Sequence, residues 1–187
     1  MAHAFTILGR GRAGRALALA LGDRAALAAK FPGRCVHMSG SLALPGVPCV
    51  HPLTSFGGRA ADWKGTPLAV TGAVPEPILA AFRDLGFLPF DLPADLKPLY
   101  HACAVLSSGH AANLWLGAAR LLELEGVELP GRGLLPLLEA TLRNVAEKGM
   151  EGRTGPFARG DEATIQRDAE ALPEAWRRVF LELGRLV

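Results

Sequence analysis

The sequence lacks an excess of charge of either sign. Its 187 residues include 20 basic and 18 acidic side chains, which gives a formal net charge of +2 at pH 7. Proteins that bind nucleic acids or anionic membranes usually carry a strong positive excess. We therefore expect neither a nucleic acid nor a membrane among the partners. The hydrophobic content of 50% is sufficient for a packed core and argues against disorder.

Cysteine is also scarce, and its spacing excludes the common paired motifs. Cys35, Cys49 and Cys103 form no C-x-x-C pair. An odd number of widely spaced cysteines indicates reduced thiols in a reducing compartment. We therefore predict a cytoplasmic protein with no metal site.

Long uninterrupted apolar runs are missing as well. The longest candidate, residues 99–122, is interrupted by His101, His110 and Arg120, which would be costly in hydrocarbon. The first residues lack the apolar centre of a signal peptide. We expect a core helix at residues 99–122 rather than a membrane span.

In the first half, short β-compatible runs alternate with helical patterns. Strands are predicted at residues 4–8, 35–38, 47–50, 68–71 and 88–92, and helices at 12–21 and 76–85. This alternation favours an α/β fold in which helices cover a mainly parallel sheet, as in a shortened Rossmann-like domain.

After Pro93 every segment has helical periodicity. Helices are predicted at residues 95–125 and 134–148, then after Asp161 as an N-cap and after Pro173. We therefore predict a Rossmann-like domain over residues 1–93 and an all-helical domain over 94–187.

A glycine-rich turn follows the first predicted strand. Its residues are Gly9, Arg10, Gly11, Arg12, Ala13 and Gly14, a G-x-G-x-x-G pattern at the start of a predicted helix. Such glycines allow a tight turn, close approach of a pyrophosphate and close packing of helix on strand. The pattern predicts a dinucleotide site, and the alternative is a turn kept for packing alone.

The acidic residue that binds the ribose of NAD is missing from its usual place. Residues 29–34 read A-K-F-P-G-R and contain no Asp or Glu. Either Arg10, Arg12, Lys30 or Arg34 meets a 2′-phosphate, or the site has lost its adenosine half. We therefore predict NADP as the cofactor, with NAD as the alternative.

Two polar segments follow the predicted strands at 35–38 and 47–50. They contain Ser39 with Gly40 and His51 with Pro52, and ligands of open α/β sheets bind at the carboxyl ends of strands. We predict that these four residues contact the cofactor. Each histidine of the two segments could instead be a structural hydrogen-bonding group.

The long helix carries a polar stripe. At 100° per residue, Lys97, His101 and Ser108 lie on one side, with Tyr100 on the flank. These three are the predicted catalytic residues, because a lysine or histidine could protonate a carbonyl or imine as hydride arrives. The alternative is a solvated helix face.

Taken in order, several segments resemble one known family. The runs G-R-G-R-A-G, H-M-S-G-S-L, H-P-L-T-S-F, K-P-L-Y-H-A-C-A-V-L-S-S-G-H, T-L-R-N-V and T-G-P-F-A-R-G-D resemble bacterial Rossmann-like proteins with domain of unknown function 2520. These proteins are relatives of pyrroline-5-carboxylate and ketopantoate reductases. The resemblance implies an N-terminal NAD(P)-binding domain and a helical C-terminal domain that dimerises, without an established substrate.

The sequence departs from this family at two places. Only about a dozen residues separate the first predicted helix from Val36, so we expect the second and third strands of the nucleotide fold to be deleted. Gly109 stands where relatives tend to have asparagine. Deletion would remove part of the adenosine site, and the change at residue 109 weakens a catalytic role for that turn.

Three functions remain open from the sequence. The first is an NADP-dependent reductase of a small carbonyl or imine compound. The second is a non-catalytic dimeric module that binds a nucleotide or another anion, and the third is a structural dimer without a ligand. A homodimer is expected because the apolar residues of 99–122 and 134–145 exceed what so small a helical domain can cover.

Overall fold

The computed structural model describes residues 6–8, 35–55 and 63–186. The chain forms two compact units, Met1–Leu114 and Trp115–Val187, each of which is described by itself. The predicted helix at 12–21 and the glycine-rich turn lie outside the described residues. The predicted domain boundary after residue 93 falls just beyond the last strand, whereas the first compact unit continues to Leu114.

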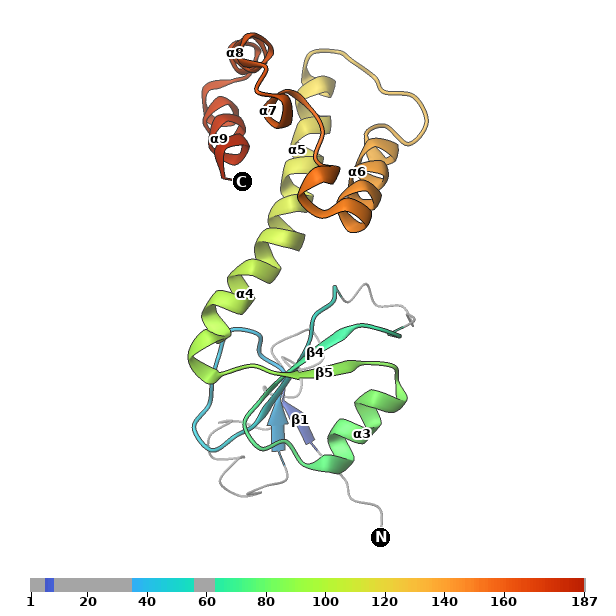
Figure 1. Ribbon diagram of the computed structural model, residues 1–187, viewed down its shortest axis with the longest axis vertical. Helices are drawn as coiled ribbons and strands as arrows, with labels where there is room; N and C mark the ends of the chain where they lie inside the picture. Colours follow the sequence, from blue (N-terminus) through green and yellow to red (C-terminus); the bar gives the residue numbers. More distant parts are fainter. Residues whose placement is uncertain (1–5, 9–34, 56–62, 187) are drawn as a thin grey trace. The chain divides into compact units, whose positions relative to one another are not determined.

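The first unit contains a mixed sheet (Figure 1). Its strands are β1 (Thr6–Leu8), β2 (Cys35–His37), β3 (Cys49–Pro52), β4 (Pro67–Thr71) and β5 (Leu88–Asp91). They lie in the order β1-β2-β3-β4-β5, and every neighbouring pair is parallel except β3 and β4. The prediction of an α/β fold with a mainly parallel sheet is confirmed.

The strand β3 differs from its prediction in position. We predicted residues 47–50, but the strand begins at Cys49 and includes His51 and Pro52. These two residues therefore belong to the strand and not to the loop that follows it. The reason is pairing, since His51 lies opposite Ala69 and Pro52 opposite Leu68 in the antiparallel ladder with β4.

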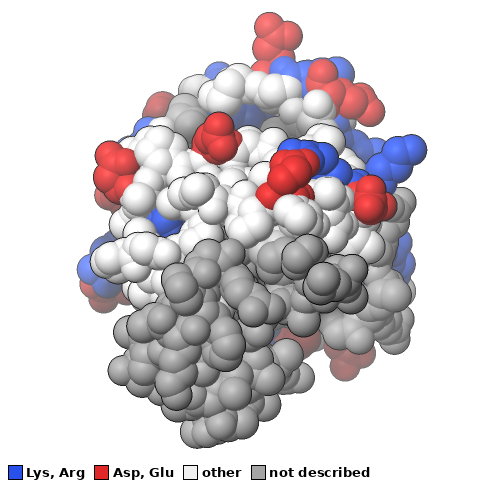
Figure 2. Space-filling view, turned by 90° about the horizontal axis from the view of Figure 1, so that it is seen from below, with Lys and Arg blue, Asp and Glu red and all other residues white. Residues whose placement is uncertain are grey.

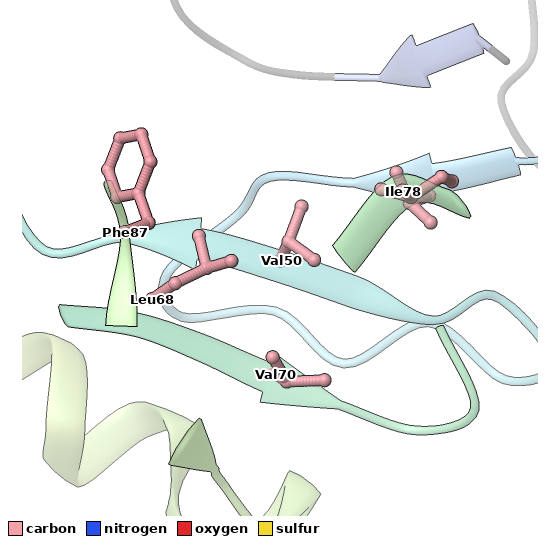
Figure 3. Packing of buried hydrophobic residues seen from close by; sticks show 6 residues of the cluster. Val50, Leu68, Val70, Ile78 and Phe87 are labelled. Carbon is pink, nitrogen blue, oxygen red and sulfur yellow. The ribbon is translucent and has the colours of Figure 1, made fainter. Parts of the chain in front are cut away.

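The core of the first unit lies between the sheet and the helix α3 (Glu76–Asp84). Val50, Leu68 and Val70 of the strands pack with Ile78 of α3 and with Phe87 (Figure 3). Each such side chain contributes about 1.5–3 kcal/mol when it is fully buried. This core holds β3, and with it His51, in a fixed position.

The predicted long helix consists of several segments. A 3₁₀ turn (Ala94–Leu96) leads into α4 (Lys97–Val105), a π-helical turn covers Leu106–His110, and α5 is Ala111–Leu124. We had expected one regular helix over residues 95–125. A π turn adds a residue to the repeat, so side chains beyond it no longer follow the 100° spacing set by α4.

The second unit is helical, as predicted. After α5 it contains α6 (Leu135–Lys148), a 3₁₀ turn (Gly149–Gly152), α7 (Pro156–Arg159), α8 (Glu162–Ala171) and α9 (Glu174–Arg185). Asp161 caps α8 by accepting a hydrogen bond from the Thr164 amide at 3.1 Å. The short helix α7 lies in the segment between the 3₁₀ turn and α8. Within the described residues, no helix is both long enough and apolar enough to cross a membrane.

Candidate active site

The candidate site begins at the carboxyl ends of two parallel strands. Leu8 ends β1 opposite His37, which ends β2. Ser39 and Gly40 follow β2 directly, and the glycine-rich turn follows β1 in the sequence. Because parallel neighbours end at the same edge of a sheet, both turns start from the edge where Rossmann-like folds bind their ligands.

Gly40 is buried against two imidazole rings. A Cβ atom at this position would lie 2.5 Å from Cδ2 of His101 and 2.9 Å from Nε2 of His51. No Cβ is accommodated at such distances unless the rings move. The missing side chain therefore lets the backbone after β2 lie directly against a histidine from β3 and a histidine from α4.

His51 and Tyr100 form a hydrogen-bonded pair. The His51 Nδ1 and the Tyr100 hydroxyl oxygen are 2.9 Å apart, and the tautomer of His51 decides which of them donates. The two rings meet edge to face with centroids 5.5 Å apart, and the His101 ring is 6.3 Å from that of His51. The β3 strand and one turn of α4 thus bring three groups capable of proton transfer together.

Both members of this pair are uncharged at neutral pH. Burial, with smaller contributions from the positive charges of Lys97 and His101, lowers the pKa of His51 to about 4. Burial raises the pKa of Tyr100 to about 12, with a smaller contribution from Cys49, which is ionised at that alkaline pH. The pair can therefore hold and pass a proton without carrying a net charge.

Lys97 is fully buried behind this cluster. Its ammonium donates hydrogen bonds to the Ser39 carbonyl oxygen at 2.9 Å and to the Cys49 Sγ at 3.1 Å. The Cys49 thiol donates to the same Ser39 oxygen at 3.3 Å. Burial raises the pKa of Cys49 although Lys97 acts in the opposite direction, so the thiol remains protonated. Lys97 thus ties α4 to both β3 and the turn after β2.

The structure brings together five of the predicted site residues. They are Ser39, Gly40, His51, Lys97 and His101. Pro52 is fully buried within β3. Ser108 is exposed in the π turn, and its hydroxyl donates to the Ala104 carbonyl oxygen at 2.6 Å. The predicted phosphate-binding residues 9–14 lie outside the described residues.

Two contributors were missing from the predicted set of catalytic and cofactor residues. The sequence places Tyr100 only on the flank of the polar stripe and assigns Cys49 no role beyond that of a reduced thiol. A signal for both exists in the sequence. Tyr100 is three residues from Lys97 on a helix, and Cys49 is two residues from His51 on a strand, so each pair shares a face.

The surface carries charges of both signs. Figure 2 shows acidic and basic side chains interspersed over the described part of one face. Surface ion pairs follow the same pattern, since Arg83, Arg120 and Arg132 each lie beside a glutamate. Such a mixture differs from the continuous basic surface by which proteins bind nucleic acids.

Comparisons with known proteins agree with this architecture. The family described as domain of unknown function 2520 matches residues 67–187. The solved structure of BF3122 from Bacteroides fragilis, whose name proposes an NADP oxidoreductase, is similar with a TM-score of 0.69 at 24% identity, covering 96% of this chain and 73% of that one. Protein TM1727 from Thermotoga maritima is similar with a TM-score of 0.67 at 24% identity, covering 81% of this chain and 66% of that one. A comparison with curated proteins found no match.

Proposed function

Because the chain belongs to the family of domain of unknown function 2520 and has a Rossmann-like fold, we propose that it is an NADP-dependent reductase of a small carbonyl or imine compound. The observation that carries the proposal is the contact of Gly40 with His51 and His101. Through this contact, side chains capable of proton transfer lie against a glycine that follows β2. Rossmann-like folds bind their ligands at this edge of the sheet.

The chain offers residues suited to each part of a nicotinamide dinucleotide. By their sequence pattern, Gly9, Gly11 and Gly14 would hold the pyrophosphate. Ser39 and Gly40, which follow β2 at this edge of the sheet, would lie beside the nicotinamide. When bound, the reduced cofactor supplies a hydride to the carbon of a carbonyl or imine group.

Tyr100 is the proton donor in this proposal. Its hydroxyl is protonated at neutral pH and can give a proton to the oxygen or nitrogen of the reduced group. His51 then returns a proton from Nδ1 to the tyrosine oxygen and takes one up at Nε2, which leaves the imidazole neutral. His101 stands beside His51 as a contact for the substrate. The Lys97 ammonium is too deeply buried to give a proton to the substrate. Its hydrogen bonds position the other groups of the site.

One observation favours a second function. Only about a dozen residues separate the first predicted helix from Val36, too few for the second and third strands that bind adenosine in a full Rossmann fold. A module that binds a nucleotide fragment or another anion without turnover would fit such a sheet. We keep this as the alternative proposal.

Calorimetric titration separates the two functions. The reductase predicts saturable binding of NADPH, tighter than that of NADH, and consumption of NADPH with an oxo acid, aldehyde or cyclic imine. Binding of nucleotide fragments alone would favour the module. Titrations without heat for any of these ligands would contradict both proposals.

The variant Tyr100→Phe tests the proton donor within the reductase proposal. Loss of general acid catalysis typically costs about 10²–10⁴ in rate, so we expect kcat to fall while the dissociation constant of NADPH is unchanged. The matched control is Gly109→Ala, since a Cβ there would meet nothing within 4 Å. An unchanged kcat in Tyr100→Phe would exclude this residue as the donor.

The proposal includes a homodimer in the cytoplasm. Exposed apolar side chains are numerous in the helical unit, including Leu116, Leu137 and Leu142 at 71%, 63% and 70% exposure. Surfaces of this kind are usually covered by a partner, and a second copy of the chain would cover them symmetrically. The thiols Cys35 and Cys49 are free and buried, as suits a reducing compartment.

A further inference from the structure

The two faces of the sheet differ in what covers them. The helix α3 packs on the face that carries Val50, Leu68 and Val70, and together they form the core. Side chains alternate between the two faces of a strand, so His51 of β3 and Phe90 of β5 lie on the opposite face. That opposite face carries the candidate site.

Tyr100 of α4 bridges two strands on this face. It is hydrogen-bonded to His51 of β3, and its ring centroid lies 6.1 Å from that of Phe90 of β5. His51 and Phe90 both lie opposite Ala69 of β4, whose small side chain leaves room for the tyrosine ring. Tyr100 therefore covers this row of the sheet, whereas Phe90 remains exposed beside it.

The next row of the same face is exposed to solvent. Leu53 is two residues after His51, and its amide continues the ladder by donating to the Pro67 carbonyl oxygen at 2.9 Å. Pro67 in turn lies opposite Leu88 of β5. Leu53 and Leu88 are both exposed, and with Phe90 they form a surface that we call the apolar patch. This patch lies directly beside the proton-transferring pair of the site.

The described strand residues around the apolar patch carry no formal charge. Those on the same face are Cys49, His51, Pro67, Ala69, Thr71 and Leu92. Lys97 contacts Cys49, which lies two rows away from Leu53 and Leu88. Sites for small molecules are usually apolar surfaces with a few convergent polar groups. The patch and the neighbouring pair of His51 and Tyr100 have this composition.

Another protein chain is a poor occupant for the apolar patch. β5 is the last strand of the described sheet, and Leu88 and Leu92 donate their backbone N–H groups toward β4. By alternation residue 89 faces the free edge, where Pro89 has no N–H group to offer a partner strand. Three side chains are also far fewer than the roughly 20–30 residues a side of a stable protein interface. The size of the patch favours part of a small molecule.

We propose that the apolar patch binds an uncharged alkyl or aryl substituent of the compound reduced at this site. This inference rests on the proposed reductase function and names its substrate class, which is aldehydes, ketones and imines with such a substituent. Residues two apart on a strand are separated by about 7 Å, so a substituent of about five to eight carbon atoms extends from beside Tyr100 to Leu53 and Leu88.

Unreactive amides test this class without requiring turnover. A carboxamide has the shape of the reducible group, but it does not accept a hydride from NADPH. Acetamide, butanamide, hexanamide and benzamide are titrated by calorimetry into the full chain, with and without saturating NADPH. We expect the affinity to rise about two- to fourfold for each added methylene group up to hexanamide, because apolar surface leaves water on the patch.

The variant Leu88→Ser asks whether the preference comes from the apolar patch. Leu88 is 59% exposed, so serine at this position removes apolar surface without opening the core. We expect the ratio of hexanamide to acetamide affinity to fall at least about threefold. The matched control is Leu85→Ser at the end of α3, since Leu85 is 57% exposed and lies outside the patch. The control keeps the wild-type ratio, and Leu53→Ser is a second variant of the patch.

Three results would overturn the inference. The first is equal affinity along the amide series, or no binding of any amide. The second is a rise in affinity that survives in both Leu88→Ser and Leu53→Ser, since the apolar group would then bind elsewhere. The third is a change of Leu88→Ser from dimer to monomer in light scattering, because a second copy of the chain would then occupy the patch.

The reductase proposal is tested separately with hexanal and benzaldehyde. A preference for hexanamide without consumption of NADPH by either aldehyde would support the patch as a binding site and contradict the reductase. Consumption of NADPH with short aldehydes, together with equal affinities for all amides, would support the reductase and overturn the role of the patch.

Discussion

At Gly40 a hydrogen atom in place of a side chain brings backbone and imidazole rings into contact. The rings come from β3 and α4, so this contact joins elements that are distant in the sequence. A larger residue would affect both the packing of the histidines and the access of the ligand.

The variant Gly40→Ala tests this contact. An added methyl group would lie 2.5 Å from the His101 ring, so either the rings or the turn must move. We expect the free energy of unfolding to fall by about 1–3 kcal/mol, as for other overpacked sites, and the affinity for NADPH to fall as well. Urea unfolding and calorimetric titration measure the two effects. Wild-type stability together with wild-type affinity would show that the contact has no importance.

The low pKa of His51 predicts how stability depends on pH. Below about pH 6.5 the unfolded chain binds a proton at this imidazole, whereas the folded protein does so only near pH 4. The free energy of unfolding contributed by this group is therefore present above pH 6.5 and is lost as the pH falls to 4, by up to about 3 kcal/mol.

The variant His51→Gln isolates that contribution. Urea unfolding of wild type and variant between pH 4 and 7.5 should show a steeper decline for the wild type, because the glutamine does not titrate. Parallel curves for the two proteins would contradict the shifted pKa.

At the scale of elements, local signals predicted the helices better than the strands. Asp161 and Pro173 begin α8 and α9 where the sequence places them, because caps act through neighbouring backbone groups. The bounds of β3 could not be predicted, since pairing with β4 decides them. The π turn at Leu106–His110 also has no recognised signature in the sequence, and it separates Ser108 from the stripe of Lys97.

The candidate site likewise combines features that the local sequence predicts with features that depend on contacts between distant residues. The strand-end argument predicted Ser39, Gly40 and His51 as site residues, because ligands of α/β folds bind at a known edge, and the helical spacing predicted His101. The burial of Lys97 could not be foreseen. It depends on the Ser39 carbonyl and the Cys49 thiol, which lie 58 and 48 residues away in the sequence. Only the folded chain brings these acceptors to the start of α4.

The packing of α5 against α9 provides a test at this scale. Gly117 lies so close to Trp176 that a Cβ atom would be 2.3 Å from the indole ring. For Gly117→Ala, overpacking outweighs the gain of about 1 kcal/mol that alanine brings to a helix, and we expect a net loss of about 1–2 kcal/mol.

Gly109→Ala is the matched control in the same helical run. Nothing lies within 4 Å of an added Cβ there, so stability should be unchanged or slightly increased. Urea unfolding curves of the two variants compare them directly. A stabilised Gly117→Ala would mean that Trp176 does not pack closely on α5.

For the whole molecule, the uneven exposure of apolar side chains is the main feature. The central strands β3 and β4 bury their large apolar side chains, whereas the helical unit exposes many, among them Trp115, Leu116, Leu137 and Leu142. Isolated surface leucines are ordinary, but a high density of them usually marks an interface. This distribution favours association through the helical unit and leaves the sheet free to bind a ligand.

Light scattering after size-exclusion chromatography tests the association. We expect a dimer at micromolar concentration, and the double variant Leu116→Glu with Leu142→Glu should shift the chain toward a monomer because it places charges on the apolar surface. The control pair Glu123→Gln with Glu147→Gln changes charge on α5 and α6 without touching those leucines. A monomeric wild type would contradict the proposed homodimer.

The central claim is that the edge of the sheet at Gly40 is a nicotinamide site, and a crystal structure with bound NADPH tests it most directly. The account predicts the nicotinamide ring beside Gly40, with His51 and Tyr100 facing its reactive carbon across the space for a substrate. A nicotinamide ring bound elsewhere, or no bound cofactor at saturating NADPH, would contradict the account.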